Sequence, residues 1–542
     1  MCLASACVVA VLPALLPALP PTVLPVFALQ ESGPRLEIDP LLLAQVVEVY
    51  DVVSSDGRDG FENPVWPGWD ARDTPILLYL PDVQDALLNH PRPPAGFVPV
   101  ETNRLPDGWT LHLRNGQTTF SLDGQNTSTD VGGIETLVVA DPISNLRPNL
   151  AQLLRGAGSG QQREADLTVG LLATDPYDQL AFVVHEAFHV HQFREAPNQA
   201  ARETWLLGYP WLDAEGLAGF ELEGRILERA LRTSDPDEAY LAALEFLAVR
   251  LDRRSRLSAD SIRYEDGTEF SEGLAKYTEW SLARALEGRR PGEPMRWARG
   301  FHGYDDLAFW RRELLETMRS NMDGEVAVNG DPYGAGGLRF RLYYSGMAIG
   351  ALLDALQAEG WHERIFEPGV TLTGLVEEML YPSKDDLAEA LIDAREAHGW
   401  EKVLEGKRAF EAKGRADGLR RANGILESER LLVIDYGALA DAAVAWSFTP
   451  FGVTRLEDGR TIYDVIPVSA QIGSTVALRQ TAAAPALHDE RERTISFALS
   501  GAVDAGELPR ELTGATLELP GASITGARGE LAVTERGIRI TL

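Results

Sequence analysis

The amino-acid sequence predicts an α+β fold, with a predominantly helical central domain between β-rich N- and C-terminal regions. Apolar residues recur at three- and four-residue spacing over residues 167–427, which is typical of helices. On either side of that stretch, short apolar or alternating runs are bounded by glycine- and proline-containing turns, as in strands. The chain has 542 residues and is 45% hydrophobic, which is ample for several cores. We therefore expect a signal peptide over 1–28, a β-rich region over 29–166, a helical domain over 167–427 and a β-domain over 428–542.

The first 28 residues predict an export signal. They are apolar and end in Val26-Phe27-Ala28, a small-residue cleavage pattern that is followed by polar residues. The prolines in this stretch would break a membrane-spanning helix. Both cysteines of the chain, Cys2 and Cys7, lie in it, so cleavage leaves a mature protein without thiols. The sequence thus predicts a secreted, periplasmic or extracellular protein with no disulfide and no cysteine ligand.

The net charge excludes two classes of partner. The chain carries 50 Lys and Arg against 81 Asp and Glu, a formal charge of −31. Nucleic acids and anionic membranes are both bound through basic groups, so neither is expected as a partner. No later apolar run is long enough to cross a bilayer, and stable membrane insertion is not expected.

The flanking regions carry strand patterns. In the N-terminal region, residues 74–80 are a short apolar run, and residues 109–113 and 118–122 flank an Asn-Gly turn that is typical of a hairpin. In the C-terminal region, residues 461–468 and 537–542 nearly alternate between apolar and polar side chains. We expect strands at these positions.

Within the central domain, the apolar periodicity predicts individual helices. They cover residues 180–193, 222–231, 240–251, 270–286 and 347–356. The first of these helices contains no proline or glycine, and it carries the strongest motif of the chain.

That motif is His185-Glu186-Ala187-Phe188-His189, an H-E-x-x-H sequence. Residues four apart on an α-helix lie about 40° apart on one face, so both imidazoles can reach one metal ion. Glu186 borders the same face and can hydrogen-bond a water at the metal without binding the metal itself. We predict His185 and His189 as metal ligands and Glu186 as the catalytic base.

A catalytic zinc site needs a third protein ligand and leaves its fourth position open. Without cysteine in the mature chain, that ligand must be His, Asp or Glu. Two downstream segments share the string Glu-Gly-Leu-Ala-x-aromatic, namely residues 215–220 and 272–277. Glu215 and Glu272 are therefore the candidates.

An H-E-x-x-H motif followed by such a string resembles the gluzincin class of zinc metallopeptidases. In that class, two histidines from one helix and a glutamate from a later helix bind zinc. Aminopeptidase-type members carry the glutamate in an Asn-Glu-Gly-x-Ala string, and residues 271–279 are close to this pattern, with Ser271 in place of Asn. The resemblance covers these motifs alone, and it implies a zincin-like central domain, a Zn2+ cofactor and a peptide or protein substrate.

The two candidate glutamates differ in their distance from the motif. Glu215 follows the second histidine by 26 residues, within the shorter spacing typical of the class, whereas Glu272 follows it by 83 residues. We assign Glu272, because its string ends in Tyr277, as in the Glu-Gly-x-Ala-x-Tyr pattern of the class, whereas the other string ends in Phe220. In addition, Glu265 and Glu269 can share its side of the helix, and a cluster of carboxylates suits a cation and its surroundings. Glu215 stays the alternative.

The sequence thus predicts a secreted zinc-dependent hydrolase, a metallopeptidase in which Glu186 activates water to cleave peptide bonds. By analogy with aminopeptidase-type members, Tyr343 and Tyr344 are candidate donors to the developing oxyanion, and His302 is another. Two other functions stay open: a zinc-binding, peptidase-like protein without turnover, and an exported binding or scaffold protein whose β-domains engage a partner. The presence of Glu186 favours turnover.

Overall fold

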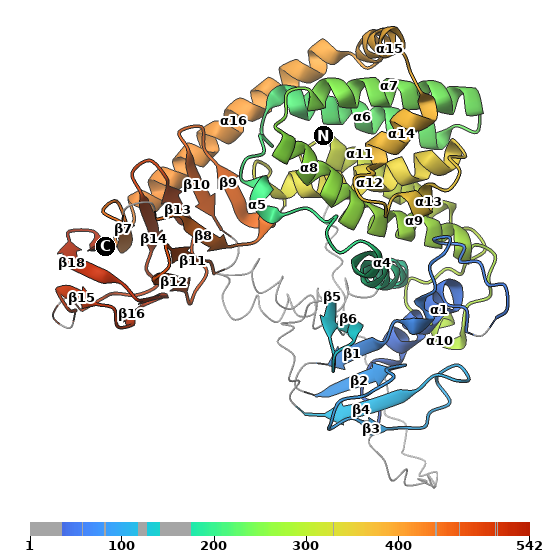
Figure 1. Ribbon diagram of the computed structural model, residues 1–542, viewed down its shortest axis with the longest axis horizontal. Helices are drawn as coiled ribbons and strands as arrows, with labels where there is room; N and C mark the ends of the chain where they lie inside the picture. Colours follow the sequence, from blue (N-terminus) through green and yellow to red (C-terminus); the bar gives the residue numbers. More distant parts are fainter. Residues whose placement is uncertain are drawn as a thin grey trace, which may run out of the picture.

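A computed structural model describes residues 35–56, 58–80, 83–116, 127–140, 175–328, 330–439, 442–464, 467–504, 506 and 508–542. The predicted export signal with Cys2 and Cys7 lies outside these residues, as does the second strand of the predicted hairpin. The described residues have the predicted α+β architecture. A helical body is flanked by an N-terminal sheet and by a C-terminal region of two sheets (Figure 1).

The N-terminal region forms a six-stranded mixed sheet in the order β3-β4-β2-β1-β6-β5. β1 pairs antiparallel with β2 and parallel with β6, which places Leu78 opposite both Ala86 and Val139. These three side chains face a core shared with the helices. The strands are β1 (Ile76–Leu80), β2 (Gln84–Leu88), β3 (Val98–Pro99), β4 (Leu111–Asn115), β5 (Thr127–Asp130) and β6 (Glu135–Ala140).

This region also contains a helix, α1 (Pro40–Val53), which is not among the elements predicted for the β-rich region. Asp39 caps it by accepting a hydrogen bond from the Leu41 backbone N–H at 2.8 Å, and Pro40 occupies its first position. The Asp-Pro pair before an apolar run is a helix-start signal that the sequence does contain. α1 packs against the helical body through α4, so its burial in that core stabilises it.

The predicted helices of the central domain are all present. The helical body consists of α4 (Pro176–Glu195), α5 (Glu203–Leu206), α6 (Ala214–Arg232), α7 (Pro236–Arg254), α8 (Ala259–Thr268), η2 (Glu269–Gly273), α9 (Leu274–Leu286), α10 (Glu293–Arg296), α11 (Ala308–Met322), α12 (Gly336–Ala355), α13 (Trp361–Arg364), α14 (Leu372–Leu380), α15 (Lys384–Ala397) and α16 (Trp400–Leu426). Among the described residues, none of these helices is both long and apolar enough to span a membrane.

α4 carries the H-E-x-x-H motif and lies between the N-terminal sheet and the rest of the helical body (Figure 1). Asp175 accepts hydrogen bonds from the backbone N–H groups of Tyr177 and Asp178, and Pro176 occupies the first turn. Apolar side chains on several sides of α4 are buried, because a sheet covers one side and α9 another. The motif therefore lies on a helix that is packed on several sides.

The chain from α8 to α9 runs through a π-helical turn, η2, which contains Glu272. Turns of this kind insert one extra residue into a helix and are frequent at functional sites. Directly after Glu272, the backbone of Gly273 lies against Gly346 of α12. A Cβ atom on Gly273 would come within 2.6 Å of the Gly346 Cα atom. The glycine of this Glu-Gly string is thus required by a close helix contact, which fixes the position of Glu272.

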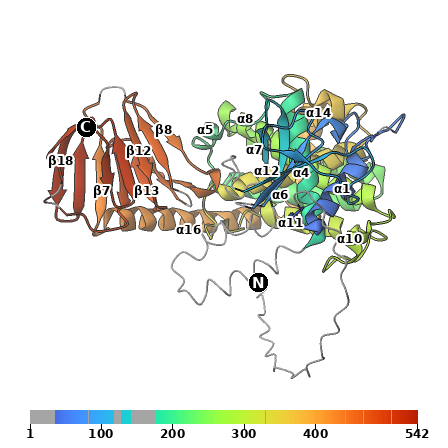
Figure 2. The same cartoon turned by 90° about the horizontal axis from the view of Figure 1, so that it is seen from below.

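The C-terminal region consists of two sheets that follow the long helix α16 (Figure 2). The larger sheet has the order β15-β18-β19-β7-β14-β13-β10-β9 and the smaller one the order β16-β17-β12-β11-β8. Their strands are β7 (Leu431–Asp435), β8 (Val444–Ser447), β9 (Val453–Arg455), β10 (Arg460–Tyr463), β11 (Ser469–Ile472), β12 (Val476–Gln480), β13 (Ala486–Asp489), β14 (Thr494–Ala498), β15 (Glu511–Thr513), β16 (Leu517–Leu519), β17 (Ala522–Thr525), β18 (Arg528–Thr534) and β19 (Gly537–Thr541).

Both strands predicted in this region are found. β10 ends at Tyr463, earlier than the pattern over 461–468 indicates, and β19 matches the predicted strand at 537–542. β19 pairs parallel with β7, so the last strand of the chain lies beside the first strand after α16. α16 packs against β13 and β14 and connects this region to the helical body.

Candidate metal site

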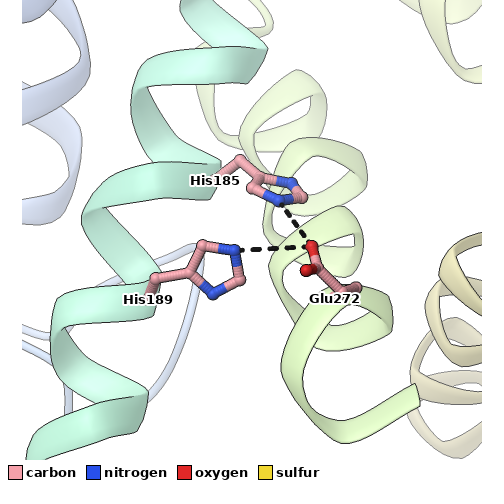
Figure 3. Close-up of side chains that lie close together, drawn as sticks. All are labelled: His185, His189 and Glu272. Atoms are coloured by element: carbon pink, nitrogen blue, oxygen red, sulfur yellow. Dashed lines mark ion pairs between the residues drawn. The ribbon is translucent and has the colours of Figure 1, made fainter. Parts of the chain in front are cut away.

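His185 and His189 lie one turn apart on α4 and direct their Nε2 atoms at the same carboxylate oxygen of Glu272 (Figure 3). The His185 Nε2 atom lies 3.5 Å from Glu272 Oε2, and the His189 Nε2 atom lies 3.6 Å from it. A tetrahedral ion such as zinc, with bonds of about 2.0–2.1 Å, requires ligand atoms about 3.3 Å apart. This group of three side chains can therefore hold a metal ion with only a small shift.

The second ring nitrogen of each histidine is bound by another side chain. His185 Nδ1 lies 2.8 Å from Glu279 Oε1, and His189 Nδ1 lies 2.9 Å from Gln192 Oε1. Carboxylate and amide oxygens accept hydrogen bonds, so each Nδ1 donates, and in a neutral ring the Nε2 lone pair is left for a metal. Partners of this kind fix the tautomer and the orientation of metal-ligating histidines.

These supporting side chains are themselves held in place. Glu279 accepts a hydrogen bond from Lys276 Nζ at 2.7 Å. The Gln192 amide donates to the carbonyl oxygen of Phe270, in η2, at 2.6 Å. The second contact ties α4 to the turn that carries Glu272, so the histidines and the third candidate ligand keep their relative positions.

Arg339 of α12 binds the other carboxylate oxygen of Glu272. Its Nη2 donates to Glu272 Oε1 at 2.8 Å, while its Nη1 pairs with Glu203. Its Nε also donates to the Tyr343 hydroxyl at 3.2 Å. Because Oε1 is engaged in this way, Glu272 presents Oε2 alone to the two histidines.

The charges around the site favour a cation between the histidines and Glu272. Burial acts to lower the pKa of His185, but hydrogen bonds to Glu272 and Glu279 outweigh burial and raise this pKa to about 10. Burial acts to raise the pKa of Glu272, yet its bonds to His185 and His189 hold that pKa well below its usual range. The carboxylates therefore stabilise positive charge here, and a divalent metal supplies such charge to deprotonated ligands.

The structure places the alternative candidate, Glu215, away from this group. Glu215 lies in the first turn of α6, is partly exposed and pairs with Arg256. The acidic side chain in a first helical turn and the ion pair are ordinary surface interactions. Of the two Glu-Gly-Leu-Ala strings, only the one at Glu272 faces the histidines.

The expectation that Glu265 and Glu269 belong to the surroundings of the metal is wrong. Both are buried and neutralised by arginines of α7: Arg250 Nη2 lies 2.7 Å from Glu269, and Arg254 Nε lies 2.7 Å from Glu265. The π-helical turn is the physical reason. Its extra residue changes the helical phase, so that Glu269 faces α7 while Glu272 faces α4.

A cavity of about 790 Å³ opens over the three candidate ligands. Glu186 lines it together with both histidines. Of the candidate oxyanion donors, Tyr343 and Tyr344 line the cavity, whereas His302 is an exposed residue elsewhere in the described chain. Burial raises the pKa of Tyr343 above its ordinary value, so its hydroxyl stays protonated at neutral pH.

The cavity has an aromatic wall to which the C-terminal region contributes. Phe451, in the short 3-10 turn η3 (Pro450–Gly452), lines the cavity and packs on Phe340 of α12 with ring centroids 5.5 Å apart. The Ala335 backbone N–H, at the start of α12, donates to the Val453 carbonyl at 2.9 Å and fixes this junction. The C-terminal region is thus part of the site.

Sequence reasoning missed four residues that support the site. The position of Glu279 could have been predicted from its spacing, because it follows Glu272 by seven residues, or two helical turns. The sequence signal for Gln192 is weaker: this residue lies one helical turn after His189. Arg339 and Phe451 come from distant segments, and no local pattern marks them.

Comparison of the chain with protein-family models, with curated proteins and with solved structures gives no match.

Proposed function

We propose that this chain is a zinc-dependent hydrolase, specifically a secreted metallopeptidase. The observation that carries the proposal is the meeting of His185 Nε2 and His189 Nε2 at one oxygen of Glu272, with Glu186 lining the same cavity. Nitrogen and carboxylate ligands from two histidines and one glutamate are a donor set of catalytic zinc sites. Export remains an expectation from residues 1–28.

In the proposed reaction, the side chains of the cavity transfer the proton and stabilise the developing negative charge. Zinc, when bound, polarises a substrate carbonyl and makes water more acidic. Glu186 accepts the proton of the attacking water and returns it to the leaving amine. Tyr343 stays protonated and can donate a hydrogen bond to the oxyanion, and its bond from Arg339 fixes its position.

The direct test is metal analysis combined with peptide cleavage. We expect the purified protein to carry about one zinc per chain and to cleave members of a mixed peptide library detected by mass spectrometry. Removal of zinc with a chelator should abolish cleavage, and added zinc should restore it. A protein that binds no zinc would contradict the metal assignment. Bound zinc without cleavage of any peptide would instead favour a zinc-binding protein without turnover.

The contribution of the C-terminal region to the cavity yields a separate prediction. Phe451→Ala should raise the KM for peptides with large apolar side chains about 5–20-fold, with little change in kcat, because a wall of the binding cavity is lost and the metal ligands are untouched.

Phe448→Ala is the matched control for this variant. Phe448 belongs to the same region but packs on Tyr463, with ring centroids 5.5 Å apart, and does not line the cavity. Its KM values should stay at the wild-type level. Equal KM values for wild type and Phe451→Ala across the library would show that the C-terminal region does not contact substrate.

A further inference from the structure

A second cavity, of about 190 Å³, lies at the first turn of α6, away from the metal-binding group. Three arginines line it, together with the aromatic side chains of Tyr209 and Phe220. The arginines are Arg253 of α7, Arg256 just after α7, and Arg341 of α12. Asp213 is the one acidic residue in the lining.

Arg341 is a buried cation without a counter-ion among the described residues. Its relative exposure is 3%, and its one hydrogen bond runs from Nη2 to the Gly324 carbonyl at 3.2 Å. Its Nε and Nη1 atoms are buried and have no hydrogen-bond partner in the described part of the chain. Burial lowers the pKa of Arg341 to about 10, so the guanidinium remains charged at neutral pH. Burying such a charge unpaired is strongly unfavourable.

The other two arginines already have acidic partners. Arg253 pairs with Glu223 and Glu265, and Arg256 pairs with Glu215 and Asp252. Their charges are thus balanced by carboxylates, whereas the charge of Arg341 is not.

The acidic residue of the lining does not compensate Arg341. The Asp213 carboxylate accepts a hydrogen bond from the Gly216 backbone N–H at 2.7 Å, as the N-cap of α6. This carboxylate is therefore engaged in capping the helix terminus and is not paired with Arg341. That terminus adds a partial positive charge to the same cavity, where Gly216 and Leu217 also belong to the lining.

We propose that this cavity is a binding site for a small oxyanion, such as inorganic phosphate, with Arg341 as its main charge partner. Guanidinium groups form charge-assisted hydrogen bonds with oxyanions, and the cavity has room for one such ion with water. Water alone would supply hydrogen bonds but no negative charge. The site is independent of the proposed peptidase activity, because it shares no residue with the metal-binding group.

The test is thermal unfolding of the full chain in increasing phosphate, with chloride used to keep the ionic strength constant. We expect the wild-type midpoint to rise by about 2–5 °C and to saturate, as for an ion that binds the folded state. Arg341→Met should lose this rise. It is expected to fold, since an apolar side chain of similar length tolerates burial better than an unpaired charge does.

Two further variants make the result specific. Arg364→Met removes an exposed arginine that pairs with Glu378 and does not line the cavity, and it should keep the wild-type response. Arg256→Met removes the most exposed of the three arginines and should raise the phosphate concentration needed for the half-maximal effect about tenfold. It provides a second test if Arg341→Met is unstable. The proposal is overturned if wild type shows no saturable rise. It is equally overturned if the rise persists in Arg341→Met, which would place the phosphate elsewhere, for example at the metal site.

Discussion

Replacing Glu186 by Gln is expected to slow peptide cleavage strongly while the protein still binds zinc. Glutamine has nearly the same size and polarity but cannot accept the proton of the attacking water. General bases contribute about 10²–10⁴-fold to such reactions, so we expect kcat/KM to fall by about 10³-fold, or about 4 kcal/mol of transition-state stabilisation. The measurement is cleavage of the best library peptide by wild type and by Glu186→Gln at equal zinc content.

The zinc content of the variant separates the two roles assigned to the motif, which are metal binding by the histidines and proton transfer by Glu186. Glu186 is not among the three side chains that meet at the metal position, so Glu186→Gln should retain about one zinc per chain. Cleavage by the variant at the wild-type rate would show that Glu186 is not the base. Loss of zinc in the variant would instead place its carboxylate among the ligands.

Glu272→Gln is expected to have the largest effect on metal affinity. Loss of a partner that only supports a ligand typically costs 10–100-fold in affinity. Glu272 contacts both histidines directly, so its replacement should lower zinc affinity by more than about 100-fold. The affinity is measured by competition with a chromogenic chelator, and circular dichroism checks that the variant is folded.

Glu215→Gln is the matched control, because Glu215 occupies the same position in the other Glu-Gly-Leu-Ala string. Its carboxylate pairs with Arg256 at the surface, so zinc affinity should stay within about twofold of wild type. If Glu215→Gln weakened zinc binding and Glu272→Gln did not, the third ligand would have to be reassigned to Glu215.

The helical motif is the part of the site that local sequence predicts well. Two histidines four residues apart must share a helix face, and the lack of Pro and Gly between residues 180 and 193 makes the helix itself a safe inference. Glu272 can also be proposed from the sequence, because its string resembles the Asn-Glu-Gly-x-Ala pattern of aminopeptidase-type zinc peptidases. The structure adds that Gly273 of this string is needed for contact with α12.

The errors of the sequence analysis have physical causes. α1 is missed although Asp39 and Pro40 mark its start, because the region around it is turn-rich and the helix is stabilised by packing against α4. Glu265 and Glu269 are expected in the surroundings of the metal because an uninterrupted α-helix would align them with Glu272. The π-helical turn changes that phase, and buried arginines of α7 take both carboxylates.

The sequence by itself determined the α+β division, the helix that carries the H-E-x-x-H motif, and the two histidines and two alternative glutamates proposed as ligands. These follow from residue periodicity and spacing, which act within a few helical turns. The tertiary structure alone decided which of two similar glutamates meets the histidines, that Arg339 holds its second oxygen, and that Phe451 completes the cavity. The physical reason is that these contacts join segments far apart in the chain, so helix packing, rather than any local preference, brings their side chains together.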